Sequence, residues 1–326
     1  MHNIKYTIIV PVKELNNYIY EQINVFEKFK RRDFEVLIIE NNLSNKKFEC
    51  NFFLKIIESG KVSPAFKRDL GARNARGDYL VFFDDDSYPS STYFDCLDNL
   101  VHNNLNIIGG PAITPLNVSI KERISGAVYS NEIFDNIVMR YIKLNVKENL
   151  IDDWPSVNLV VKKDIYNEVG GFNTNLWPGE DAEFCNKIVY KYGYQINYSK
   201  DLYCYHHRRK TLIGHFKQIC SYGLHRGFLA KKNKTNSKKI LYFGPSIFIL
   251  IWLFSFLSIF NKLFLPAVLI LIIYILIYFY SFFIKRRNET IFVRIISLPF
   301  LFIGHFFYGL YFLKGWNTKN LKSKLR

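Results

Sequence analysis

The sequence predicts an α/β fold, with a mixed, mostly parallel sheet that has helices on both faces, followed by C-terminal transmembrane helices. Residues 6–12 and 79–83 are short, continuous apolar runs, which are typical of strands buried on both faces of a sheet. A helical stripe separates the first run from the next one at 34–39, and a strand, helix and strand at this spacing form a right-handed parallel unit. After residue 240 nearly every residue is apolar, in runs close to the roughly 20 residues that a helix needs to cross a bilayer.

The other elements of the α/β part follow from the same patterns. The first helix is predicted from one apolar stripe, which consists of Leu15, Ile19, Ile23, Phe26 and Phe29. Further strands are predicted at residues 52–57, 107–111, 157–161 and 202–205. Helices are predicted within 63–77 and 92–104, and the segment 118–150 is expected to be mostly helical and irregular. Segment 63–77 also carries basic side chains that could face one crevice with the acids that follow it (Lys67, Arg68, Arg73 and Arg76).

Three consecutive acids, Asp84, Asp85 and Asp86, come directly after the apolar run 79–83. Open α/β sheets bind ligands at the carboxyl ends of their strands, and this is where the acids would lie. Adjacent carboxylates repel one another unless a cation or hydrogen-bond donors are present. The functional interpretation is a site in which carboxylates and a diphosphate share Mg²⁺ or Mn²⁺. The structural alternative is a solvated acidic turn.

A second acidic group follows a glycine-containing turn, where Glu180, Asp181 and Glu183 open a predicted helix. Acids at this end of a helix complement its dipole, which is a complete structural reason for them. A carboxylate at a loop-to-helix boundary is also where a general base could reach a bound hydroxyl. Further along the chain, His206 follows a predicted strand and could add a nitrogen ligand to the metal, although the basic run 206–210 is typical of a solvated or membrane-facing surface.

The charge and the cysteines restrict the class of protein. Lysine and arginine outnumber the acids 44 to 28 in 326 residues, and a net charge of +16 indicates a polyanionic partner such as nucleic acid, an anionic membrane or phosphorylated substrates. The five cysteines are scattered without a C-x-x-C spacing, which favours reduced thiols in the cytoplasm over a disulfide framework or a zinc site. The chain also enters its first strand without a signal-like segment, which predicts a cytoplasmic soluble part.

The apolar C-terminal part predicts a membrane domain. Runs 240–260 and 263–284 are expected to form a membrane hairpin, with basic flanks on the cytoplasmic side. Run 291–313 contains Arg294, Pro299 and His305, so it is expected to cross the membrane, re-enter it or lie along the interface. A third crossing would place the basic tail outside, against the positive-inside rule, so the sequence leaves open whether this run spans the membrane.

We therefore predict four parts. They are a cytoplasmic domain at 1–230, a basic linker at 231–239, a membrane domain at 240–313 and a basic tail at 314–326.

The motifs, in this order, resemble those of the family 2 glycosyltransferases, inverting nucleotide-sugar enzymes with the Rossmann-like GT-A fold. The resemblance covers residues 4–207. The opening strand 8–12, the second strand 36–41, the segment Ala72-Arg-Asn74 and the strand ending in the acidic triplet look like the donor side. Asn158, Val169-Gly-Gly-Phe172 and Gly179-Glu-Asp181 look like the acceptor side.

The resemblance implies a role for each matching residue. The donor and its metal would be held by Pro11, Glu40, Arg73, Asp84 and Asp85, with Glu40 at the base and Asp84 at the ribose or the metal. Asp86 would be the principal ligand of Mn²⁺ or Mg²⁺, joined by Asp84 and His206. Asp181, with Glu180 beside it, would deprotonate the acceptor hydroxyl.

Two departures from the family pattern bear on the function. The second strand ends in Glu40-Asn41 where the family has paired aspartates, and the Q-x-x-R-W signature of processive synthases is missing after Gln218, which favours addition of a single sugar. The leading hypothesis is a multi-pass protein of the inner cell membrane that transfers a sugar from a nucleotide-diphosphate sugar to a lipid-linked or membrane-proximal glycan. The products would be cell-surface polysaccharide or glycolipid, and the anionic membrane would be a partner.

Two alternatives stay open from the sequence, and a third is disfavoured. A polyprenyl-phosphate sugar transferase would use the same site with a bare lipid phosphate as acceptor. A catalytically inactive nucleotide-sugar sensor or scaffold would keep the membrane anchor without the reaction. Nucleic-acid binding would explain the charge, but it explains neither the membrane hairpin nor the acidic triplet, so we predict no nucleic-acid partner.

Overall fold

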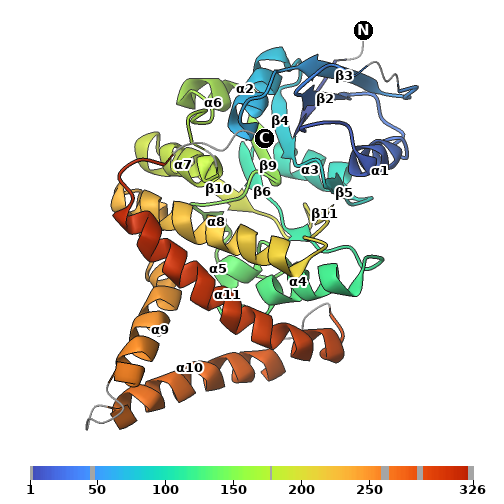
Figure 1. The fold of residues 1–326 in the computed structure, drawn as a ribbon. Helices are drawn as coiled ribbons and strands as arrows, with labels where there is room; N and C mark the ends of the chain where they lie inside the picture. Colours follow the sequence, from blue (N-terminus) through green and yellow to red (C-terminus); the bar gives the residue numbers. More distant parts are fainter. Residues whose placement is uncertain (1–2, 45–47, 177, 258–263, 285–288, 322–326) are drawn as a thin grey trace. The chain divides into compact units, whose positions relative to one another are not determined.

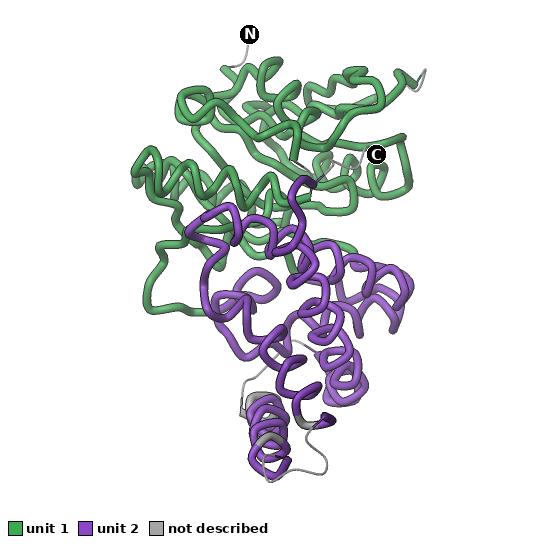
Figure 2. Tube along the Cα trace, turned by 60° about the vertical axis from the view of Figure 1, so that its left-hand side comes forward, with its two compact units in different colours: residues 1–113, 145–207, 322–326 green, residues 114–144, 208–321 purple. Residues whose placement is uncertain are grey.

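The computed structural model describes residues 3–44, 48–176, 178–257, 264–284 and 289–321 (Figure 1). These residues form two compact units (Figure 2). Unit 1 contains residues 3–113 and 145–207, and unit 2 contains residues 114–144 and 208–321. Segments 114–144 and 208–231 therefore belong with the apolar helices rather than with the sheet. The division into a cytoplasmic domain at 1–230 and a membrane domain stays a prediction.

Unit 1 is built on an eight-stranded sheet with the strand order β3-β2-β1-β4-β9-β6-β10-β8. Its strands are β1 (Tyr6–Pro11), β2 (Phe34–Glu40), β3 (Phe53–Glu58), β4 (Tyr79–Phe83), β6 (Ile107–Gly109), β8 (Leu150–Ile151), β9 (Asn158–Lys162) and β10 (Ile196–Tyr198). The four strands from β3 to β4 are parallel, whereas β9 runs antiparallel to both β4 and β6. Every residue of β1, β2 and β4 is buried, as expected for strands covered on both faces. The prediction of a mixed, mostly parallel sheet is confirmed.

A second sheet of three strands lies at the end of β4, with the order β5-β11-β7. Its strands are β5 (Ser87–Pro89), β7 (Ala112–Ile113) and β11 (Cys204–His206). The predicted strand at 202–205 is thus displaced toward the C-terminus, and its pairing places His206 opposite Ser87. Two- and three-residue strands such as β5, β7, β8 and β10 are too short to produce a periodic pattern, and the sequence did not predict β5, β7, β8 or β10.

The helices of unit 1 are α1 (Asn17–Phe26), α2 (Pro64–Asn74), α3 (Tyr93–His102), α6 (Lys163–Val169) and α7 (Glu180–Asn186), which continues into a π-helical turn (Lys187–Lys191). Asn16 caps α1, since its side chain accepts hydrogen bonds from the amides of Tyr18 and Ile19. Helix α2 starts with Ser63 as its cap and Pro64 in its first turn, and it packs on β1 and β2. These local signals fix α1 and α2 beside the carboxyl ends of the parallel strands.

Unit 2 is helical, with α4 (Ile120–Ser130), α5 (Asp135–Val138), α8 (Leu212–Lys231), α9 (Ile240–Leu257), α10 (Phe264–Ile284) and α11 (Ile291–Asn317), and a 3-10 turn (Thr235–Ser237). Two described segments are long and apolar enough to cross a membrane, Thr235–Phe254 and Ile291–Asn317. The second predicted run, 263–284, forms the helix α10. The third apolar run is one continuous helix, α11, which contains Pro299 and extends past the predicted end at 313.

Helices α8 and α11 approach one another closely at glycines. A Cβ atom at Gly227 of α8 would lie 2.0 Å from the carbonyl oxygen of Phe312, and one at Gly223 would lie 2.4 Å from that of Tyr308. From the other side, a Cβ atom at Gly315 of α11 would lie 1.9 Å from the carbonyl oxygen of Leu224. Small residues that bring two backbones into contact are typical of helix pairs in membrane proteins.

We expect Gly227→Ala to lower the stability of the protein, because the added methyl group meets backbone that cannot move aside; overpacking of this kind typically costs about 1–3 kcal/mol. Gly244→Ala is the matched control, since nothing lies within 4 Å of a Cβ atom at that position of α9. Alanine there should be neutral or stabilising by up to roughly 1 kcal/mol through helix propensity. Thermal unfolding of the detergent-solubilised variants measures both. Equal melting temperatures for Gly227→Ala and the parent would contradict the close packing.

Candidate active site

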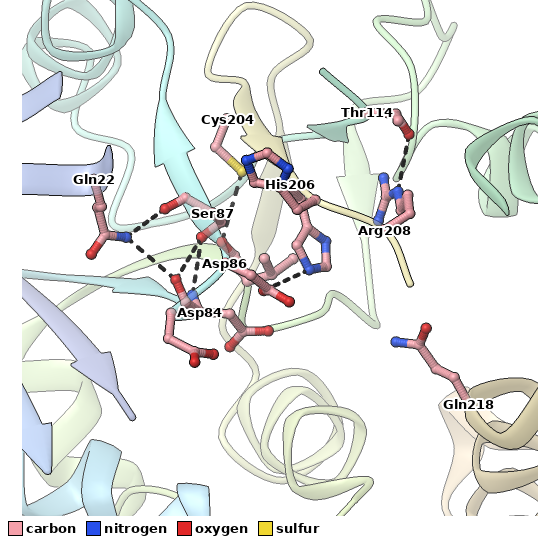
Figure 3. A network of polar contacts seen from close by, with 12 residues as sticks. Gln22, Asp84, Asp86, Ser87, Thr114, Cys204, His206, Arg208 and Gln218 are labelled. Carbon is pink, nitrogen blue, oxygen red and sulfur yellow. Dashed lines mark hydrogen bonds and ion pairs between the residues drawn. The ribbon is translucent and has the colours of Figure 1, made fainter. Parts of the chain in front are cut away.

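The acidic triplet follows β4 directly, and its backbone is held in place by side chains around it. The amide of Asp84 donates to the hydroxyl of Ser87 over 3.1 Å, and that hydroxyl donates to the Asp84 carbonyl over 3.0 Å (Figure 3). The side-chain amide of Gln22, on α1, donates to the Ser87 carbonyl over 2.5 Å and to the Asp84 carbonyl over 3.3 Å. The backbone of the loop is therefore held in one conformation by Ser87 and Gln22, whether its carboxylates are solvated or bind a cation.

Asp84, Asp86 and His206 offer one ligand atom each, and these atoms lie within 4.8 Å of one another. The Nε2 atom of His206 lies 3.0 Å from Oδ1 of Asp86 (Figure 3). The pairing of β11 with β5 produces this geometry, together with a hydrogen bond of 2.9 Å from the amide of His207 to the carbonyl of Asp86. The two carboxylates supply the oxygen ligands that Mn²⁺ and Mg²⁺ prefer, and the imidazole offers one nitrogen beside them.

One arginine joins this cluster to the second acidic group. Arg68, on α2, donates from Nη2 to Oδ1 of Asp84 over 2.6 Å and from Nη1 to Oε1 of Glu180 over 2.8 Å. The side chains of Arg68 and Glu180 are only 4% and 5% exposed. Asp181 follows Glu180 in the first turn of α7, and its carboxylate accepts a hydrogen bond of 2.8 Å from the amide of Ala182. Unit 1 therefore brings both acidic groups of the sequence to one place.

Burial and, after it, the charge of Asp181 raise the pKa of Glu180 from 4.5 to about 8, against the opposite effect of the Arg68 guanidinium. The folded protein then holds a proton on Glu180 that the unfolded chain releases at lower pH. This contribution to stability is complete below pH 4.5 and is lost as the pH rises through about 8.

We expect Glu180→Gln to flatten that part of the pH dependence, because an amide cannot ionise. Melting temperatures of the parent and the variant, compared from about pH 5 to about 9, measure the effect. A difference between the two proteins that stays constant over this interval would contradict a protonated Glu180.

The structure places the other predicted site residues as follows. Pro11 ends β1 at the same edge of the sheet as the acidic loop. Glu40 is buried, and its two carboxylate oxygens accept hydrogen bonds from the amides of Leu15 (2.9 Å) and Ser44 (3.2 Å). Asp85 accepts a hydrogen bond of 2.8 Å from the side chain of Asn16. The roles predicted for Pro11, Glu40 and Asp85 stay predictions.

Arg73 is exposed in the last turn of α2, and in the described part of the chain no hydrogen bond or ion pair joins it to the acidic loop. Arg68 is the basic residue of α2 that reaches the acids. The sequence placed both arginines in a segment that could face the acidic crevice, but nothing in the local pattern distinguished one from the other. The difference follows from the helix, on which these two positions face different directions.

Lys67 contacts Asn41, the residue that follows Glu40. Its buried ammonium group donates to the carbonyl of Val12 and, over 2.6 Å, to Oδ1 of Asn41. The lysine thus ties the ends of β1 and β2 together.

The model of the glycosyltransferase-like family 2 matches residues 7–243. The chain belongs to this family. A curated relative of this glycosyltransferase is the dolichyl N-acetyl-alpha-D-glucosaminyl phosphate 3-beta-D-2,3-diacetamido-2,3-dideoxy-beta-D-glucuronosyltransferase of Methanococcus voltae, which is 24% identical over 95% of this chain and 96% of its own length. Glycosyltransferase AglE of Haloferax volcanii is 20% identical over 60% of this chain and 64% of its own length.

A solved structure supports the same fold. The mannosyltransferase PcManGT from Pyrobaculum calidifontis, solved with GDP-Man and Mn²⁺, aligns with 98% of this glycosyltransferase and 89% of its own chain, at a TM-score of 0.57 and 14% identity. The GT-A fold and the transferase class predicted from the sequence are confirmed. At this identity the likeness concerns the fold, so the donor and the metal of this enzyme have to be argued from its own residues.

Proposed function

We propose that this glycosyltransferase moves one sugar from a nucleotide-diphosphate sugar to a lipid-linked acceptor, with inversion at the anomeric carbon. The observation that carries the proposal is the contact of Arg68 with both Asp84, a predicted metal ligand, and Glu180, the neighbour of the predicted base. In this proposal Asp84, Asp86 and His206 hold a divalent ion, and Asp181 is the general base.

The reaction balances with these groups. Asp181 accepts the proton of the acceptor hydroxyl, and the hydroxyl oxygen forms a bond to the anomeric carbon from the face opposite the leaving group. The bond between the anomeric carbon and the diphosphate oxygen breaks, and its electron pair leaves with the nucleoside diphosphate. A bound divalent ion would stabilise the charge that develops on the diphosphate. The ion we propose is Mn²⁺ or Mg²⁺, because two of the three ligands are carboxylates.

A lipid-linked acceptor is supported by two separate features. The relative from Methanococcus voltae matches over nearly its whole length, and its name describes a dolichyl-phosphate-linked sugar as the acceptor. In this chain α9, α10 and α11 expose large apolar side chains, among them Trp252, Phe256, Leu265 and Leu276. We propose that these helices anchor the enzyme in the inner membrane, with the sheet-containing domain on the cytoplasmic side and basic residues near anionic head groups.

The proposal is tested with a panel of nucleotide sugars. Thermal shift of the detergent-solubilised protein with Mn²⁺ identifies the donor, and transfer of radiolabelled sugar from that donor identifies the acceptor. We expect label on a lipid-linked sugar. Label on the bare lipid phosphate would instead indicate a polyprenyl-phosphate sugar transferase, and donor binding without transfer to any lipid would indicate a sensor. The proposal would be overturned if no nucleotide sugar, with or without Mn²⁺, shifted the melting temperature of the protein.

A further inference from the structure

Arg68 occupies a position that the reaction itself does not explain. Its guanidinium group is nearly inaccessible and contacts one carboxylate from each acidic group, through two different nitrogens. Its third nitrogen, Nε, is buried and has no hydrogen-bond partner among the described residues. The ring of Phe172 lies against the guanidinium group, with its centroid 5.8 Å from Cζ.

Stability of the fold alone does not account for the contacts of Arg68. The acidic loop is already fixed by Ser87 and Gln22, and α2 is fixed by its cap and by its packing on β1 and β2. Replacing a buried ion pair by apolar residues is often neutral or stabilising, so such a pair is poor evidence for a role in stability alone. The unsatisfied Nε and the contacts with one carboxylate from each acidic group point instead to a role in holding the two groups at a set distance.

We infer that Arg68 is a positioning residue, which fixes the orientation of Asp84 in the metal site relative to Glu180 and the adjacent base Asp181. The inference rests on the proposed function for its catalytic meaning. The planar guanidinium group presents two donors at a fixed separation, so it holds the two carboxylates at a fixed distance as well. A lysine at this position could keep the charge, but its ammonium group is a point charge and could not present two donors in one plane at a fixed separation.

The experiment uses the full-length enzyme in detergent. The variants are Arg68→Lys, Arg68→Met, Glu180→Leu and the double variant R68M/E180L, since leucine removes the oxygen that accepts from Arg68. Arg32→Met is the control, because Arg32 is an exposed arginine of the same unit whose guanidinium donates to the carbonyl of Arg31. The readouts are kcat and KM for the donor, and hydrogen exchange of the amides at 178–187, where α7 begins.

We expect both Arg68 variants to lower kcat by about tenfold or more while KM changes little, because misplacement of catalytic groups by about 1 Å can cost far more than this in rate. Exchange at 178–187 should rise in both variants and remain unchanged in Arg32→Met. If Arg68 acts by holding Glu180, the effects of R68M and E180L on kcat should not multiply in the double variant.

Three results would overturn the inference. Full activity of Arg68→Lys would show that charge alone is needed. A raised KM with unchanged kcat would make Arg68 a donor ligand. Multiplying effects in the double variant, with unchanged hydrogen exchange, would mean that Arg68 and Glu180 act independently. Should Arg68→Met fail to fold, Arg68→Lys decides by the same readouts.

The exchange readout separates this inference from the proposed function. A parent enzyme that transfers no sugar, but whose α7 exchange depends on Arg68, would contradict the proposed function and retain the bridge between the acids.

Discussion

Asp181→Asn is expected to remove nearly all sugar transfer. The asparagine has the same shape, and its oxygen can still accept the hydrogen bond from the Ala182 amide, but it cannot take the proton of the acceptor hydroxyl. General base catalysis typically contributes about 10²–10⁴ in rate, so kcat should fall by that factor. Initial rates with the donor identified by the panel measure the loss.

The donor should still bind to this variant, because Asp181 is not among the predicted metal ligands. The Mn²⁺-dependent thermal shift by the donor is therefore expected to match that of the parent. Asp164→Asn is the control, since Asp164 is an exposed aspartate in the first turn of α6 and its substitution removes the same charge from a similar position. Near-normal turnover of Asp181→Asn would mean that another group is the base.

The sequence predicted those parts of the molecule whose signal is local. The continuous apolar run of β4 marked a buried strand, and the three acids after it marked the edge where ligands bind. His206 was also a candidate ligand from its place beyond a strand. The pairing of β11 with β5, which brings it to Asp86, involves strands of three residues and leaves no periodic pattern to detect.

Arg68 and the glycines of α8 could not be assigned from the sequence because their roles depend on residues far away in the chain. Arg68 meets Glu180 across 112 positions. Gly227 has to be a glycine because the backbone of Phe312 lies against it. The same reason applies to the segments 114–144 and 208–231, which pack with the apolar helices although their own composition resembles that of a soluble domain.

Glu40 shows how a local motif can have a second explanation. Its place at the end of the second strand predicts a contact with the base of the nucleotide. In the structure both carboxylate oxygens already accept backbone amides, from Leu15 and Ser44, which fix the loops after β1 and β2. A carboxylate can accept more than two hydrogen bonds. Glu40 could therefore hold these loops and contact the base of a nucleotide at the same time.

Asp86→Ala should remove the metal dependence of the enzyme together with its activity. Asp86 supplies one of three donors that lie within 4.8 Å of one another, and it carries half of the carboxylate charge in that set. A divalent ion contributes several kcal/mol of charge stabilisation, and each 1.36 kcal/mol is a factor of ten, so transfer should fall by on the order of 10²–10³ or more. Asp95→Ala, at an exposed position of α3, is the charge-matched control.

Melting temperatures measured without and with Mn²⁺ provide the sharper comparison, because they separate loss of the metal from damage to the fold. The variant loses repulsion between adjacent carboxylates but also loses the contact of Asp86 with His206, so without Mn²⁺ it should unfold close to the temperature of the parent. Addition of Mn²⁺ should raise the melting temperature of the parent and of Asp95→Ala but not that of Asp86→Ala, since an ion stabilises only the state that binds it. An Asp86→Ala variant that still gained stability from Mn²⁺ would place the ion elsewhere, and Asp84 and His206 would then need another explanation.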